Sequence, residues 1–259
     1  MSFNFCPECG FKLNAEYKFC PECGYALAKA VNPAPAKKPT ATTKPKTSTP
    51  QTKKPAATAN TAIKEGASDA EKRATAERLI KAYRHPEGFP LFLELAEKGD
   101  AYFQQVVGRC YYLGWGCTKD YRKSLYWNEK SAEQGDHRGQ FSAGVLYTGY
   151  DGVETNYKKA VYWFTKSAKQ GNDDAQRHLA ECYEFGKGVE QDCKKALYLY
   201  TESAEQENSL AQARLGYFYE NGIGTAVDIQ KAIYWYKKAA EYGDSDCKRA
   251  LRRLGIKID

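Results

Sequence analysis

A period of 36 residues runs through the apolar and polar positions between Glu94 and Glu241. Alanines recur at this spacing at Ala96, Ala132, Ala168, Ala204 and Ala240. Three more columns keep the same register: a tyrosine followed by a large apolar residue, a glutamine, and a second tyrosine (Tyr126-Trp127, Tyr162-Trp163, Tyr198-Leu199 and Tyr234-Trp235; Gln104, Gln140, Gln176 and Gln212; Tyr111, Tyr147, Tyr183 and Tyr219). Several columns in one register indicate a tandem array, in which residues shared between units serve the scaffold.

Each unit predicts two helices. Asp or Asn precedes both of them, where a short side chain can accept hydrogen bonds from free backbone N–H groups (Asp100, Asp136, Asn172, Asn208 and Asp244 before the first; Asp120, Asn156, Asp192 and Asp228 before the second). Glycine pairs such as Gly114/Gly116 turn the chain between the helices. Full repeats are expected near 96–131, 132–167, 168–203 and 204–239. Helices near 69–83, 91–97 and 245–254 are expected to flank them.

A few positions depart from the repeat. Tyr150 stands where the first turn glycine belongs, and Leu199 replaces a tryptophan. Glu207 replaces the closing glycine, at a cost of about 1 kcal/mol if its backbone is left-handed. We interpret the tyrosines and tryptophans of the second helices as packing residues, because they recur in nearly every unit. Cys110 and Cys182 fall in an apolar column of the first helices and are also assigned to packing.

The segment Ala132-Glu133-Gln134-Gly135-Asp136, with the later Gly-x-Gly turn and Tyr-Trp pair, resembles the Sel1-like repeat, a relative of the tetratricopeptide repeat. This resemblance implies an all-α fold over residues 65–259, a right-handed superhelical solenoid of helix–turn–helix repeats. Such a solenoid has a concave face lined by the first helices. The family resemblance also implies binding of a protein or peptide to that face.

One stripe of the first helices is left over after two faces are assigned to packing. Its residues differ from unit to unit, as expected of a groove that recognises a specific partner. The alternative is that they are ordinary solvent-exposed surface. The predicted partner-binding residues are Val106, Arg109, Leu113, Ser142, Val145, His178, Glu181, Phe185, Arg214, Tyr217 and Asn221.

The first 27 residues contain the pentapeptide Cys-Pro-Glu-Cys-Gly twice, at residues 6–10 and 20–24. Four thiolates with no open position favour a closed structural Zn²⁺ site, so Cys6, Cys9, Cys20 and Cys23 are predicted ligands. A redox pair, an iron site and a disulfide are the alternatives. Zinc binding contributes about 10–16 kcal/mol in small finger peptides, enough to fold so short a segment. The paired knuckles resemble a zinc ribbon over residues 1–27.

Residues 28–64 are rich in Ala, Pro, Lys and Thr and hold eight lysines with no acidic residue. Such a composition predicts an extended tether that cannot offset its ordering entropy. Its lysines attract phosphates by counterion release, or merely keep the tether soluble. Residues 65–259 hold 29 basic and 29 acidic residues, so the excess positive charge lies in the tether.

These features favour a non-catalytic adaptor that carries Zn²⁺ and binds another protein. The alternative is a nucleic-acid-associated regulator that uses the zinc ribbon and the basic tether. An enzyme is not expected, because His85, His137 and His178 occupy unrelated repeat positions. No apolar run approaches the ~20 residues that span a bilayer, and the start lacks a secretory pattern. A cytoplasmic protein is therefore expected, and the scattered remaining cysteines favour a reducing compartment.

Overall fold

The computed structural model describes residues 66–257, and its helices confirm the predicted all-α solenoid. The chain divides into two compact units, Met1–Lys72 and Arg73–Asp259, and the description below concerns the second. The zinc ribbon predicted for residues 1–27 and the tether predicted for 28–64 lie outside the described residues.

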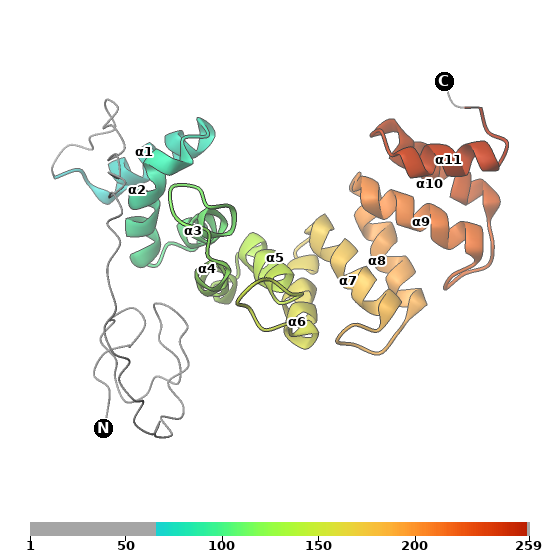
Figure 1. Cartoon of the computed structure of the whole chain (residues 1–259), viewed down its shortest axis with the longest axis horizontal. Helices are drawn as coiled ribbons and strands as arrows, with labels where there is room; N and C mark the ends of the chain where they lie inside the picture. The colour runs from blue at the N-terminus through green and yellow to red at the C-terminus, as the bar shows by residue number, and fades with distance from the viewer. Residues whose placement is uncertain (1–65, 258–259) are drawn as a thin grey trace, which may run out of the picture. The chain divides into compact units, whose positions relative to one another are not determined.

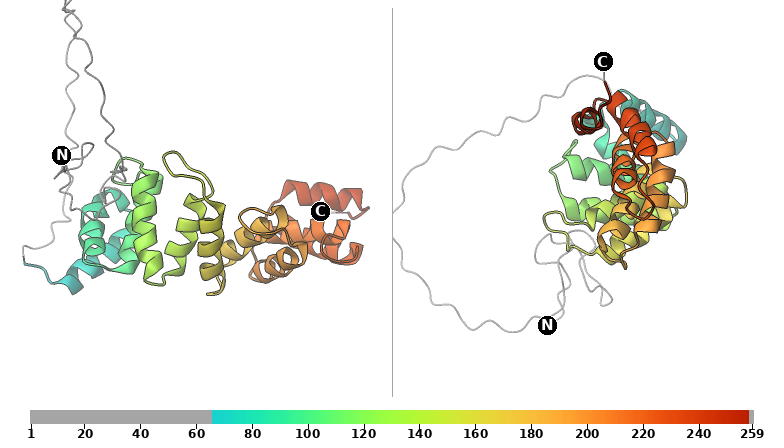
Figure 2. Two further views of the ribbon diagram at one scale, coloured as in Figure 1. Left: turned by 90° about the horizontal axis from the view of Figure 1, so that it is seen from below. Right: turned by 90° about the vertical axis from the view of Figure 1, so that its right-hand side faces the viewer.

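From α2 to α11, each helix packs against the next one along the chain (Figure 1). Figure 2 shows the same succession from two further directions. The helices are α1 (Asp69–Lys81), α2 (His85–Glu97), α3 (Ala101–Leu113), α4 (Tyr121–Glu133), α5 (His137–Leu146), α6 (Tyr157–Ala168), α7 (Asp173–Phe185), α8 (Cys193–Glu205), α9 (Ser209–Asn221), α10 (Ile229–Glu241) and α11 (Ser245–Arg253).

We call α3–α4, α5–α6, α7–α8 and α9–α10 repeats one to four, and the contact of one repeat with the next a junction. The first junction therefore joins α3 and α4 to α5, and the third joins α7 and α8 to α9. None of the helices in the part of the chain that the structure describes is long and apolar enough to cross a membrane.

The predicted helix starts are confirmed by hydrogen bonds. Each predicted Asp or Asn accepts from backbone N–H groups of the first turn, as Asp100 Oδ1 does from Tyr102 and Phe103 at 3.0 and 3.2 Å. Helix α2 differs from expectation, because it begins at His85 rather than near Leu91. Pro86 is tolerated in its first turn, where the backbone N–H would have no helical acceptor.

The glutamine column ties neighbouring repeats together. Gln104 is buried, and its Nε2 donates to the carbonyl oxygen of Ala96 at 3.2 Å, while its Oε1 accepts from Gln134 Nε2 at 2.7 Å. The same pair of bonds recurs one repeat later, through Gln140 and Gln170. Because both partners recur every 36 residues, this column serves the scaffold, as the sequence predicted.

A column of small residues on the first helices lets a side chain of the second helix come close. A Cβ atom added at Gly144 would lie 2.6 Å from the ring of Phe164, and one at Gly216 would lie 2.6 Å from Tyr236. At Gly108 the same atom would lie 2.5 Å from the amide of Asn128. In repeat one an asparagine therefore occupies the place that an aromatic ring has in repeats two and four.

Two expectations about single positions have different outcomes. Glu207 has φ 67°, which confirms a left-handed residue without glycine. The packing role given to the tyrosines of the second helices is wrong for three of them, because Tyr162, Tyr198 and Tyr234 are exposed. Successive helical residues point about 100° apart, so the neighbouring Trp163 takes the buried direction and Tyr162 is left outside.

Candidate partner-binding site

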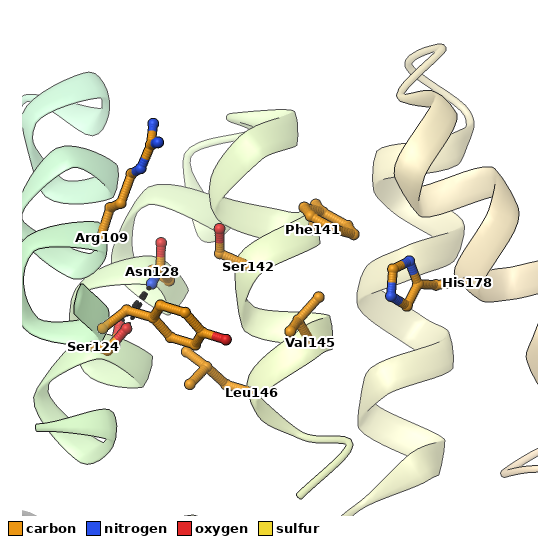
Figure 3. A pocket seen from close by; sticks show the side chains of 9 residues that line it. Arg109, Ser124, Asn128, Phe141, Ser142, Val145, Leu146 and His178 are labelled. Carbon is orange, nitrogen blue, oxygen red and sulfur yellow. Dashed lines mark hydrogen bonds between the residues drawn. The ribbon is translucent and has the colours of Figure 1, made fainter. Parts of the chain in front are cut away.

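A pocket of about 260 Å³ opens on the first helices, with walls from α3, α4, α5 and α7 (Figure 3). It brings together four of the residues predicted to bind a partner: Arg109, Ser142, Val145 and His178. Five further lining residues were not part of that prediction: Tyr112, Ser124, Asn128, Phe141 and Leu146. Stripe residues of three consecutive repeats therefore share one concavity.

The pocket lies where repeat one departs from the other repeats. Phe164 packs against His178 with ring centroids 5.2 Å apart, and Tyr200 packs against Phe218 at 5.2 Å. The residue 36 positions before Phe164 is Asn128, and the residue 36 positions before His178 is Ser142. Both replacements are smaller than the side chains they correspond to, which leaves the space between α4 and α5 unfilled.

A second cluster of predicted residues forms at the third junction. The Arg214 guanidinium carbon lies 4.6 Å from the ring centroid of Tyr217 and 5.6 Å from that of Phe185. Phe185 is 55% exposed and Tyr217 41% exposed. Two large aromatic side chains with a cation between them are typical of residues that dominate protein interfaces.

Arg214 forms an ion pair with Glu184, which is buried near the end of α7. The Glu184 carboxylate accepts from Arg214 Nε at 3.0 Å and from the Tyr200 hydroxyl at 2.8 Å. A second guanidinium nitrogen of Arg214 also contacts this carboxylate. Burial and the neighbouring carboxylate both raise the pKa of Tyr200, so the phenol stays a neutral donor.

The other predicted residues lie in varied surroundings. Val106 is only 7% exposed and belongs to the packing of α3. Leu113 is exposed, and the Asn221 amide donates to the carbonyl oxygen of Tyr217 at 2.9 Å. Glu181 forms an ion pair with Arg177, at 2.6 Å between Oε1 and Nη1. Val106 therefore has little surface to offer, whereas the exposed members remain candidates for binding.

His178 forms the far wall of the pocket. Its Nδ1 lies 2.8 Å from the carbonyl oxygen of Asp174, and its ring packs on Phe141 at 5.3 Å between centroids. Burial lowers the pKa of this imidazole, and the charge of Arg177 lowers it further. Near neutral pH the pocket therefore presents a neutral imidazole at this wall.

Two of the described cysteines lie in the apolar column of the first helices. Cys110 and Cys182 are buried, which confirms their assignment to packing. Burial raises the pKa of Cys110 to about 12 and that of Cys182 to about 11, so the nucleophilic thiolate is disfavoured. The sequence also contains one Ser-x-x-Lys spacing among the described residues, from Ser245 to Lys248, and the exposed Ser245 hydroxyl lies 3.5 Å from Asp246 Oδ1 at the start of α11.

The predicted zinc ligands cannot be placed, because Cys6, Cys9, Cys20 and Cys23 lie outside the described residues. Within residues 66–257 there is no group of three or more His, Cys, Asp or Glu side chains that could hold a metal ion.

Comparison with known proteins agrees with both parts of the sequence interpretation. The Sel1 repeat model matches residues 101–136, 137–172, 173–208 and 209–244, and a zinc-ribbon domain model matches residues 5–27. These four units have the same 36-residue period as the repeats predicted from the sequence, but the first begins at residue 101 rather than near residue 96. No curated protein matches the chain significantly.

Two of the solved structures that are similar to this chain share more than 30% of its residues over the aligned part. One is c5321, a protective antigen of uropathogenic Escherichia coli strains displaying an SLR fold; it is 40% identical, with a TM-score of 0.61, over 66% of this chain and 36% of that one. The other is a Sel1 repeat protein from Oxalobacter formigenes; it is 32% identical, with a TM-score of 0.65, over 72% of this chain and 82% of that one. The chain thus spans about a third of the length of the Escherichia coli protein.

Proposed function

Because the chain belongs to the Sel1 repeat family, we propose that it is a non-catalytic adaptor that binds a partner polypeptide along the first helices of its solenoid. The observation that carries this proposal is the division of labour between positions. Residues that recur in every repeat, such as Gln104 and Gln140, are buried in the scaffold. Seven of the eleven stripe residues, which vary between repeats, line a pocket or form the exposed Phe185–Arg214–Tyr217 cluster.

The N-terminal module would add a second binding element. Four thiolates in two Cys-Pro-Glu-Cys-Gly knuckles fit the donor set of a closed structural Zn²⁺ site, so we assign Cys6, Cys9, Cys20 and Cys23 as ligands. A reducing compartment such as the cytoplasm keeps these thiols available to the metal. The tether predicted from composition would let the ribbon and the solenoid engage one partner twice, or two partners at once.

The second candidate function is nucleic-acid association, favoured by the eight lysines without an acid in residues 28–64. Counterion release would make such binding strongly salt-dependent and insensitive to sequence. We rank it second, because that segment has neither arginine nor aromatic residues for base stacking.

The adaptor proposal is tested by capture from nuclease-treated cell lysate on the immobilised full chain. The variant Phe185→Ser/Tyr217→Ser removes the exposed cluster. The matched control Tyr198→Ser/Tyr234→Ser removes two exposed aromatic side chains from the second helices. We expect at least one captured protein to fall about tenfold with the first variant and to persist with the control. Equal capture by all three proteins would reject the groove, and capture that nuclease abolishes would favour the second candidate.

The zinc assignment has its own measurement. After dialysis, elemental analysis should find about one zinc per four-cysteine site, and Cys9→Ser should lower that content. Far-ultraviolet circular dichroism of the same variant should keep its helical signal, because the helices lie in residues 69–253. A full chain without bound zinc, or with iron in its place, would contradict the assignment.

A further inference from the structure

The pocket at the first junction contains an unpaired hydrogen-bond acceptor. Asn128 is 1% exposed, and its Nδ2 donates to the Ser124 carbonyl oxygen at 2.8 Å and to Ser124 Oγ at 3.2 Å. Its Oδ1 is buried and accepts no hydrogen bond from any residue between 66 and 257. In Figure 3 the oxygen lies on the side of the amide that faces away from Ser124. An unpaired buried acceptor is unfavourable, so a ligand that donates a hydrogen bond to it is stabilised there.

The other repeats show what is missing from this space. At the third junction the ring of Tyr200 lies between α7 and α9, and its hydroxyl is bound by Glu184. The fourth repeat keeps this pair, because the Tyr236 hydroxyl donates to Glu220 Oε2 at 2.8 Å. The pocket of repeat one therefore occupies the position that an aromatic side chain, in two cases a phenol with a bound hydroxyl, fills elsewhere in the same chain.

The residue of repeat one that corresponds to Glu184 and Glu220 is Tyr112, and it forms a different hydrogen bond. Its hydroxyl donates to the Tyr150 hydroxyl at 2.8 Å, and the two ring centroids lie 5.4 Å apart. Tyr150 is the residue that breaks the glycine turn of repeat two. The first junction therefore lacks the glutamate that accepts a hydrogen bond in repeats three and four. The acceptor present there instead is the amide oxygen of Asn128.

We propose that this pocket receives an aromatic side chain with a hydrogen-bond donor, a tyrosine or a tryptophan, from a bound polypeptide. The donor group binds Asn128 Oδ1, and the ring lies against Phe141, Val145 and Leu146. This inference rests on the proposed function, because it supplies one anchor of the polypeptide that the first helices bind. The pocket of about 260 Å³ has room for a ring, since cavities of about 150 Å³ hold benzene.

The lining also excludes other ligand classes. An anion would meet the carbonyl oxygen of Asn128, which can only accept hydrogen bonds. A lysine ammonium would lose its hydration next to apolar walls, with the Arg109 guanidinium at the same pocket. A phenylalanine ring would fit but would leave Oδ1 unpaired. A neutral ring with one donor packs on the apolar lining and pairs with Asn128 Oδ1.

The first test uses small probes and the full chain alone, with no partner needed. Binding of p-cresol and toluene, the side-chain analogues of tyrosine and phenylalanine, is followed by ¹⁵N–¹H chemical-shift changes. Asn128→Leu keeps the branching and the number of side-chain heavy atoms but removes the acceptor, and Asn128→Phe fills the space as Phe164 does in repeat two. We expect Asn128→Leu to lower the preference for p-cresol over toluene about tenfold, and Asn128→Phe to abolish binding of both probes.

The pocket assignment is overturned if wild-type chain shows no p-cresol shifts at the pocket residues, or if Asn128→Phe binds p-cresol as wild type does. It is also overturned if Asn128→Leu leaves the preference unchanged, which would mean that bound water already satisfies Oδ1. Thermal unfolding of both variants, run alongside, shows whether a lost signal reflects a lost fold rather than a filled pocket.

The second test identifies the occupant, by selecting a random peptide library on the full chain with counter-selection on Asn128→Phe. Enrichment of tyrosine or tryptophan at one position supports the proposal. Enrichment without either residue overturns the aromatic anchor but keeps the groove. Binding of p-cresol with no selected peptide rejects the polypeptide groove itself, so failure of the pocket and failure of the proposed function give different results.

Discussion

The first and third junctions of this solenoid are built on the same repeat positions and end in opposite states. At the third junction Glu184, Tyr200 and Arg214 form one hydrogen-bonded group that fills the space between repeats. At the first junction the corresponding residues are Tyr112, Asn128 and Ser142, and a pocket remains. A repeat therefore tolerates loss of its junction ring without losing its helices, and a binding site can arise at the gap.

The comparison also separates two kinds of variation between repeats. Residues such as Phe185 and Tyr217 vary on the exposed surface and change what a partner meets directly. Asn128 varies at a buried position inside a junction and changes the shape of the surface that the first helices present. The glutamine and alanine columns are the same at both junctions, so they give no sign of either kind of variation.

The largest expected effect comes from opening the third junction to match the first. Tyr200→Asn deletes a ring that is 1% exposed and takes away the hydroxyl that Glu184 binds. We expect a loss of about 4 kcal/mol in the free energy of unfolding, from the cavity and the weakened polar group together. Urea titration followed by circular dichroism measures this loss.

The matched control for that prediction is Tyr198→Asn, two residues away on the same helix. Tyr198 is 62% exposed, so its loss should change the free energy of unfolding by no more than about 0.5 kcal/mol. If the two variants were equally stable, the third junction would not depend on its ring, and the contrast with the first junction would lose its energetic meaning.

Closing the first junction should have a smaller effect of opposite sign. Asn128→Phe removes the unpaired Oδ1 and fills the space against Gly108, as Phe164 does against Gly144. The lost hydrogen bonds to Ser124 offset part of the gain, so we expect about 1–2 kcal/mol of stabilisation. The same urea titration applies. A destabilised variant would show that the gap is already filled, by water or by relaxed neighbours.

Most of the scaffold was predictable from the sequence, because the same interactions recur. Asp100 and its equivalents were identified as caps from one side chain and its spacing, and Gln104 from its column. The pocket was predicted only in part, through Arg109, Ser142, Val145 and His178. Asn128 could not be predicted, because it stands on a second helix in the column of Phe164, Tyr200 and Tyr236, and one smaller side chain in a packing column does not by itself indicate a pocket.

Two misassigned positions show what the pattern lacks. Val106 was placed on the open stripe from helical spacing and Tyr162 in the core because tyrosine recurs there in every unit, yet Val106 is buried and Tyr162 exposed. Helical spacing gives the direction of a side chain around its own helix. It does not give the crossing angle and depth of the neighbouring helices, which decide how wide the buried face becomes.

A third prediction concerns the backbone turns at the same two junctions. The turn before α9 holds Glu207 at φ 67°, whereas the turn before α5 holds Gly135 at φ 93°. Glu207→Gly should therefore stabilise the fold by about 1 kcal/mol, since a side chain is disfavoured in this conformation. The control Gly135→Glu installs the same strain at the first junction and should cost about as much. Equal stability of all three proteins in urea titration would exclude backbone strain as a difference between the junctions.

The smallest expected effect depends on pH and lies at the second junction, where the position of Ser142 and Arg214 is taken by His178. Burial lowers the pKa of His178 and the charge of Arg177 adds to this, while the Asp174 carbonyl and Glu181 oppose it. A folded pKa below the ordinary value of 6.5 means that the unfolded chain binds the proton more tightly. The stabilisation from neutral His178 is therefore fully present above that value and is lost as the pH falls below it.

The difference in unfolding free energy between wild type and His178→Gln should shrink on going from neutral to mildly acidic solution. His85, whose pKa burial also lowers, is present in both proteins and cancels in the difference. A difference that stayed constant, or grew, as the pH fell would show that the imidazole at this junction is not held neutral.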